Sequence, residues 1–189
     1  MKKINTLLVM LLVAGASFAQ TWSVDKAHSK LGFSTVHLLV SDVDGSFKNF
    51  DAKITSSKED FSDAVIELTA DAASVNTENE KRDEHLKSPD FFDAAKFATL
   101  TFKSKSFKKV SGKNYKLVGD LTLHGITKSV ELDVILNGIA VHPYNKKSIA
   151  GFKIKGVIKR SDFGIGAGTP SAVVSDEVTI TANTEFAKD

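Results

Sequence analysis

The residues best suited to ligand chemistry in this chain are one histidine and two arginines, namely His37, Arg82 and Arg160. The alternation in KLGFSTVH places His37 on the same strand face as Phe33 and Thr35, so its imidazole should point into an interior or the mouth of one. There it could hydrogen-bond a polar group of a ligand, or it could be satisfied by backbone carbonyls or by Thr35.

The two arginines are sharper candidates, because a guanidinium that faces an apolar interior is unfavourable unless it meets a carboxylate or a phosphate. Arg82 lies in a short polar helix, and Arg160 lies at the inward-facing end of a strand. Both have structural alternatives. Arg82 could pair with Glu78 one helical turn earlier, and Arg160 could pair with Asp162.

The sequence gives no support to catalytic or metal chemistry. The chain has no cysteine, and no metal-ligand spacing occurs among its five histidines, which are His28, His37, His85, His124 and His142. A zinc-binding helix motif, a P-loop, a serine nucleophile elbow and a carboxylate pair are also missing. The glycines from Gly164 to Gly168 lead into Pro170 and a strand, so they form a flexible loop. We therefore predict no catalytic residue, no metal and no cofactor apart from a bound ligand.

Strands must position these residues, because most of the chain alternates between apolar and polar residues with period two. After a short lead-in at residues 21–25, eight long segments alternate, near residues 30–40, 43–55, 64–73, 98–109, 114–124, 127–141, 149–161 and 173–187. Turns are expected at Asp44-Gly45, Ser111-Gly112-Lys113 and His124-Gly125. The fold class is thus all-β, an eight-stranded antiparallel up-and-down barrel similar to a lipocalin, with an open sandwich as the alternative.

One short helix near residues 78–88 interrupts the strands. Thr77 and Glu80 have the spacing of a capping box, which starts the helix at Glu78, and Pro89 ends it. A helix of about three turns with Leu86 as its only large apolar residue must dock on something larger, so we expect it to form a lid over the barrel.

The inward positions of the strands combine large aliphatic residues with small ones such as Gly119 and Ala182. An eight-stranded barrel is either filled by side chains or holds one small ligand, and the small residues favour an underfilled lumen, unless the glycines only relieve strain at barrel corners. An apolar lining suits an alkyl or isoprenoid tail. The expected lining residues, each of which could also serve an ordinary core, are Phe33, Leu68, Phe91, Phe92, Phe102, Leu121, Leu132, Phe152, Ile154 and Gly156.

The amino-terminal residues are typical of an export signal. Lys2 and Lys3 precede an apolar run at residues 7–14, and cleavage is expected between Ala19 and Gln20, which leaves one domain at residues 20–189. Removing residues 1–19 takes away two lysines and leaves 23 basic and 23 acidic residues. A neutral chain without a long apolar segment predicts a periplasmic or secreted protein with no nucleic-acid partner and no stable membrane anchor.

Four motifs of this chain together resemble the YceI-like family. They are DKAHSKLGF at residues 25–33, SVNTENEKRDEHLKSPDFFD at 74–93, GDLTLHGITKSV at 119–130 and IKRSDFGI at 158–165. The resemblance implies a secreted, lipocalin-like barrel that holds an isoprenoid or similar long-chain lipid. Within these motifs, His85 is a further head-group candidate, and Asp25 beside His28 is either a hydrogen bond that locks the fold or a binding contact.

The sequence therefore predicts a binding protein, not an enzyme, that sequesters or carries one isoprenoid-like or quinone-like lipid. One alternative is an enzyme that acts on a lipid in the same cavity, with His37 or His85 as acid or base. Another is an interaction or stress protein with a filled barrel. A homodimer would have to form through outward faces or loops, since closure of the barrel seals its edges.

Overall fold

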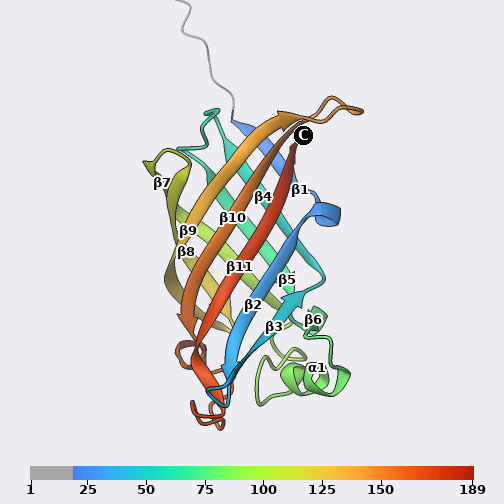
Figure 1. Ribbon diagram of the computed structural model, residues 1–189, viewed down its shortest axis with the longest axis vertical. Coiled ribbons are helices and arrows are strands. Elements are labelled where there is room, and N and C mark those ends of the chain that lie inside the picture. The colour runs from blue at the N-terminus through green and yellow to red at the C-terminus, as the bar shows by residue number, and fades with distance from the viewer. Residues whose placement is uncertain (1–18) are drawn as a thin grey trace, which may run out of the picture.

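The computed structural model describes residues 19–189, which form one barrel with a helix at one end (Figure 1). The strands are β1 (Gln20–Val24), β2 (Lys30–His37), β3 (Ser41–Phe47), β4 (Phe50–Ser56), β5 (Val65–Asp71), β6 (Val75–Asn76), β7 (Thr99–Ser111), β8 (Asn114–Leu123), β9 (Ile126–Val141), β10 (Ser148–Lys159) and β11 (Val174–Lys188). The helix α1 spans Glu80–Lys87, and three short 3-10 helices, η1 to η3, span Lys26–His28, Ala72–Ser74 and Arg160–Phe163. The expected signal peptide lies outside the described residues except for Ala19.

Eight antiparallel strands close the barrel in the order β1-β4-β5-β7-β8-β9-β10-β11, and β11 returns to pair with β1. The predicted eight-stranded up-and-down fold is confirmed. The predicted lead-in is in fact β1, where Trp22 lies opposite both Lys188 and Ile54. Its five residues are too short to show a period, yet they supply the pairings that close the ring.

The interruption at η1 splits one long strand into β1 and β2, which both pair with β11. The next predicted strand is likewise split into β3 and β4. The expected turn at Asp44-Gly45 is wrong, because both residues lie inside β3 and pair with Ser34 and Phe33. The chain turns earlier, between His37 and Ser41.

Aromatic side chains fill one end of the barrel, which we call the plug end. Phe61, only 1% exposed, comes from the loop between β4 and β5 and packs edge-on against Trp22 and Phe152 at ring-centroid distances of 5.1 and 5.2 Å. Phe152 in turn packs against Phe186 at 5.9 Å. This cluster closes the core where β1 meets β11.

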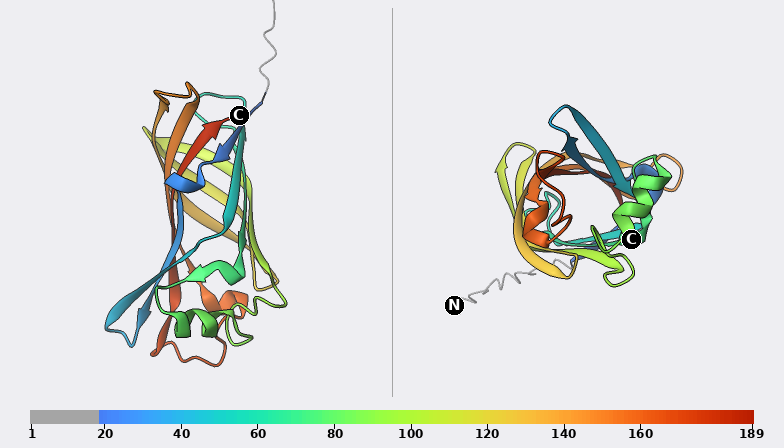
Figure 2. Two further views of the ribbon diagram at one scale, coloured as in Figure 1. Left: turned by 90° about the vertical axis from the view of Figure 1, so that its right-hand side faces the viewer. Right: turned by 90° about the horizontal axis from the view of Figure 1, so that it is seen from below.

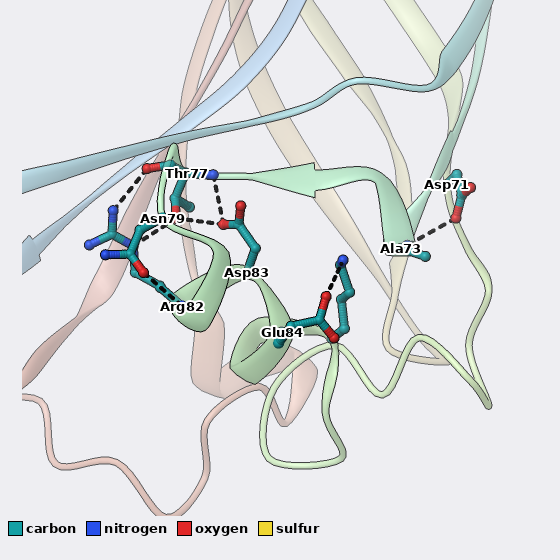
Figure 3. Close-up of polar contacts among 8 residues, drawn as sticks. Asp71, Ala73, Thr77, Asn79, Arg82, Asp83 and Glu84 are labelled. Carbon is teal, nitrogen blue, oxygen red and sulfur yellow. Dashed lines mark hydrogen bonds and ion pairs between the residues drawn. The ribbon is translucent and has the colours of Figure 1, made fainter.

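The opposite end, which we call the lid end, carries α1, the tip of the β2–β3 hairpin and residues 160–173 (Figures 1 and 2). The lid helix is confirmed, but it begins at Glu80, because Glu78 adopts a left-handed backbone with φ of 62°. Asn79 is the N-cap and accepts from the Arg82 amide at 3.0 Å. Thr77 binds the buried Asp83 instead of forming the expected capping box, with its amide 2.8 Å and its hydroxyl 2.6 Å from Oδ1 (Figure 3).

Candidate functional site

A cavity of about 210 Å³ runs through the barrel from the plug end to the lid end. Almost all of its surface is carbon, since the inward positions of the strands are mostly aliphatic and aromatic. Phe107, Leu117 and Phe152 line it toward the plug, whereas Leu86 and Phe92 line it beside the lid. Leu86 is thus the docking residue of α1, as the sequence predicts.

Most of the expected lining residues lie on this cavity. The lining includes Phe33, Leu68, Phe91, Phe92, Phe102, Leu121, Leu132, Phe152 and Ile154. The alternation that assigned them is visible in β10, where Phe152, Ile154 and Ile158 face inward and Lys153 and Lys155 are exposed. Whether these residues contact a ligand stays a prediction.

Gly156 is the exception, because a neighbouring side chain covers it. A Cβ atom placed on Gly156 would lie 2.3 Å from Cδ2 of Leu132, and one placed on Gly119 would lie 2.4 Å from the Phe102 ring. Both glycines therefore make room for a large residue of the adjacent strand, and the cavity is not the space that they leave. Gly45 accommodates the Phe33 ring in the same way, at 2.2 Å.

Arg160 also lines the cavity, at the lid end, and its side chain is buried with 6% of the residue exposed. Its guanidinium donates five hydrogen bonds to backbone carbonyls. Nε donates to Ser175, the first terminal nitrogen to Ile165 and Gly166, and the second to Thr169 and Val174, over 2.7–3.2 Å. The pair with Asp162, which the sequence leaves open as a structural alternative, does not form, because the partners are backbone carbonyls. All five N–H groups are used to hold residues 165–175, which comprise the loop after η3 and the first two residues of β11.

The other polar candidates lie away from the cavity lining. Arg82 is exposed, and both of its side-chain hydrogen bonds go to Thr77 and not to Glu78. Its Nε donates to the Thr77 hydroxyl at 2.7 Å, and a terminal nitrogen donates to the Thr77 carbonyl at 2.9 Å (Figure 3). His85 is exposed with Nε2 3.5 Å from an Asp90 carboxylate oxygen. His37 is exposed at the end of β2. The structure does not bring these three side chains together.

Sequence reasoning missed one polar residue of the lining, Thr184. Its hydroxyl is buried and has no hydrogen-bond partner among the described residues. Thr184 pairs with Phe152 across β10 and β11, so it lies toward the plug end. The signal was available, because the alternation in ANTEF puts Thr184 on the same inward face as Ala182 and Phe186.

Asp25, His28 and Glu185 form a group whose carboxylate and imidazole atoms all lie within 4.8 Å of one another. Such atoms could hold a cation, but Asp25 already uses both oxygens, to accept from the Ala27 amide and to pair with His28 Nδ1, both at 2.9 Å. The hydrogen bond with His28 lowers the pKa of Asp25 and raises the pKa of His28. The group therefore caps η1 and helps to hold it on β11.

Comparison with known proteins places this geometry in a family. The model of the YceI-like domain matches residues 22–186. The UPF0312 protein SA2479 of Staphylococcus aureus (strain N315) is 38% identical over 169 residues, which are 87% of this chain and 96% of that protein.

Solved structures of known proteins agree with this family assignment. The Campylobacter jejuni YCEI protein is 35% identical with a TM-score of 0.74, over 82% of this chain and 90% of that one. A polyisoprenoid binding domain from Saccharophagus degradans shares the fold at 16% identity and a TM-score of 0.67, over 90% and 99% of the two chains. Within residues 19–189, no helix has the length and apolar character needed to span a bilayer. The chain belongs to the YceI-like domain family.

Proposed function

We propose that this protein binds one long-chain lipid, isoprenoid-like or quinone-like, inside the barrel and sequesters or carries it. The observation that carries the proposal is the long cavity with a carbon surface. Each methylene that enters such a site contributes about 0.8 kcal/mol, so a long chain can bind without a charged contact. Protein interiors pack densely, so a hydrocarbon also restores contacts that the lining side chains would otherwise lack.

The lining favours recognition of the chain over recognition of the head group. Arg160 is the only ionisable residue of the lining in the described part of the chain, and carbonyls already occupy its five N–H groups. The Thr184 hydroxyl has no hydrogen-bond partner among the described residues, but neighbouring atoms cover it and it presents almost no surface to the cavity. A lipid with one small polar group, such as an isoprenol or a quinone, fits this lining better than a polyanionic lipid.

Binding without chemistry is the better-supported form of the proposal. His37 and His85, the acid or base candidates of the enzymatic alternative, are exposed and absent from the lining. General acid–base catalysis needs a titratable group within hydrogen-bond reach of the reacting atom. Export fits a carrier as well, so the proposal includes removal of residues 1–19 and a periplasmic or extracellular location.

A pair of variants tests the proposal. Ala182 lines the cavity, whereas Asn183, the next residue of β11, is exposed. Protein purified without detergent should release about one lipid per chain into an organic extract, as measured by mass spectrometry. Ala182→Phe should lose that lipid because its ring enters the cavity, and Asn183→Phe should retain it. Wild-type protein that releases no lipid, or equal lipid in both variants, would refute the proposal.

A further inference from the structure

The tip of the β2–β3 hairpin exposes three consecutive apolar residues. Leu38 is 53% exposed, Leu39 72% and Val40 85%. Large apolar residues so exposed and adjacent are unusual on a soluble protein and mark surfaces that meet an apolar partner.

The backbone at this tip is held in a shape that leucine disfavours. The Val40 amide donates to the His37 carbonyl at 3.0 Å, which closes a turn whose central residues, Leu38 and Leu39, both have positive φ, at 51° and 59°. Asn-Gly is the usual sequence for such a turn. The Leu38 amide also donates to the Val173 carbonyl at 2.9 Å, so the tip is braced against the segment that leads into β11. Two leucines at these positions are unfavourable for folding, which points to a role outside folding.

The tip lies at the lid end, next to the cavity. Thr35 in β2 and Val174 in β11 line the cavity, and His37, directly before the tip, pairs with Val174. Figure 2 shows the hairpin projecting from the barrel at the end where α1 lies. The exposed leucines are therefore only a few residues from the apolar interior.

The charges of the two segments that form and brace the tip indicate the class of partner. Residues 34–47 and 164–176 contain Asp42, Asp44 and Asp176 and no lysine or arginine. The exposed part of the second segment, residues 167–173, carries no charge. An apolar tip beside an uncharged loop suits the interfacial region of a bilayer, and the aspartates disfavour an anionic one.

We propose that Leu38, Leu39 and Val40 insert into the interface of a zwitterionic bilayer and hold the lid end of the cavity against the membrane, where lipid passes between the two. This inference rests on the proposed function, because a bilayer is where a long-chain lipid resides. Docking of this kind is peripheral and reversible, since three side chains bury little apolar area.

The turn geometry supplies a variant that removes the apolar tip and keeps the hairpin. Leu38→Asn with Leu39→Gly installs the residues that positive φ favours, so it should fold at least as well as the wild type. The matched control is Val141→Ser with Tyr144→Ser in the β9–β10 hairpin. Val141 is 64% exposed and Tyr144 is 89% exposed, and this hairpin lies at the plug end (Figure 1). Flotation with phosphatidylcholine vesicles measures docking.

We expect the tip variant to bind vesicles at least about tenfold more weakly than the wild type, and the control to stay within about twofold. A wild type that does not float, or a tip variant that floats as well as the wild type, would overturn the proposal. So would a stronger binding of the wild type to vesicles with phosphatidylglycerol at low salt. If the wild type is a dimer by light scattering and the tip variant a monomer, with no flotation of either, the tip contacts a second copy and the proposal is wrong.

Binding of geranylgeraniol to delipidated protein separates this test from that of the proposed function. The tip variant should bind geranylgeraniol like the wild type, because the cavity is unchanged. Loss of flotation with intact binding supports docking, and failure of the wild type to bind would count against the lipid function alone. Equal loss of both in the tip variant would indicate damage to the barrel and would refute the assignment of the tip to docking.

Discussion

At Arg160, backbone carbonyls replace the carboxylate that a buried guanidinium usually meets. The five carbonyls belong to residues 165–175. The arginine therefore holds this segment around its own guanidinium at the edge of the cavity. Alternation along β10 places Arg160 inward, and the sequence therefore predicts its burial. The partners could not be predicted, because the carbonyl positions depend on the path of a loop that has no period.

Arg160→Lys tests this arrangement at the residue scale. Lysine keeps the charge but has three donors without the planar fork, so at least two carbonyls lose their partner. We expect the free energy of unfolding in urea to fall by about 2–4 kcal/mol. Asp162→Ala is the control, since Asp162 is the partner that the sequence suggested, and it should change stability by less than about 0.5 kcal/mol. A larger effect at Asp162 than at Arg160 would contradict the geometry.

Among the elements, the loop at residues 57–64 plugs the barrel, and apart from Ala64 the alternation of the sequence does not assign it to the core. Phe61 has φ of 58°, a conformation that no aromatic residue favours, so neither propensity nor period marks it as the buried residue of this loop. The loop is fixed from both sides. The Tyr115 hydroxyl donates to the Asp60 carbonyl at 2.7 Å, and Asp63 accepts hydrogen bonds from Ser56 and Ser57.

Asp63 should make the plug sensitive to acid. The Ser56 and Ser57 hydroxyls hold the pKa of Asp63 well below its ordinary value. A lowered folded-state pKa adds stability above about pH 4, and that stability is lost as the pH falls toward the folded-state pKa. Asp63→Asn should therefore cost about 1 kcal/mol near pH 7, a small amount because the carboxylate is exposed. The difference from the wild type should shrink near pH 2.5.

Urea unfolding of both proteins at the two pH values measures this effect. Glu59→Gln, an exposed change in the same loop, is the control and should show no pH-dependent difference. A deficit of Asp63→Asn that grows on acidification would contradict the assignment.

For the whole molecule, the long strands and their inward faces follow from alternation, whereas closure and the cavity boundary do not. Strands β8 and β10 bury the residues that period two assigns, because a pleated strand has only two faces. The cavity depends on how side chains of adjacent strands interlock. From the sequence alone, Gly119 and Gly156 suggest unfilled space in the lumen. In the structure, the side chains of Phe102 and Leu132 on the adjacent strands fill that space.

Stability of the barrel should therefore depend on its ligand. A lipid that binds only the folded protein raises the free energy of unfolding by about 2.7 kcal/mol at a free concentration of 100 times Kd. We expect delipidation to lower Tm, and geranylgeraniol to restore it in proportion to its concentration. Ala182→Phe, in which the ring enters the cavity, should show a Tm that responds to neither treatment, while Asn183→Phe should respond like the wild type. Equal responses of the two variants would mean that the lipid stabilises the protein from outside the barrel.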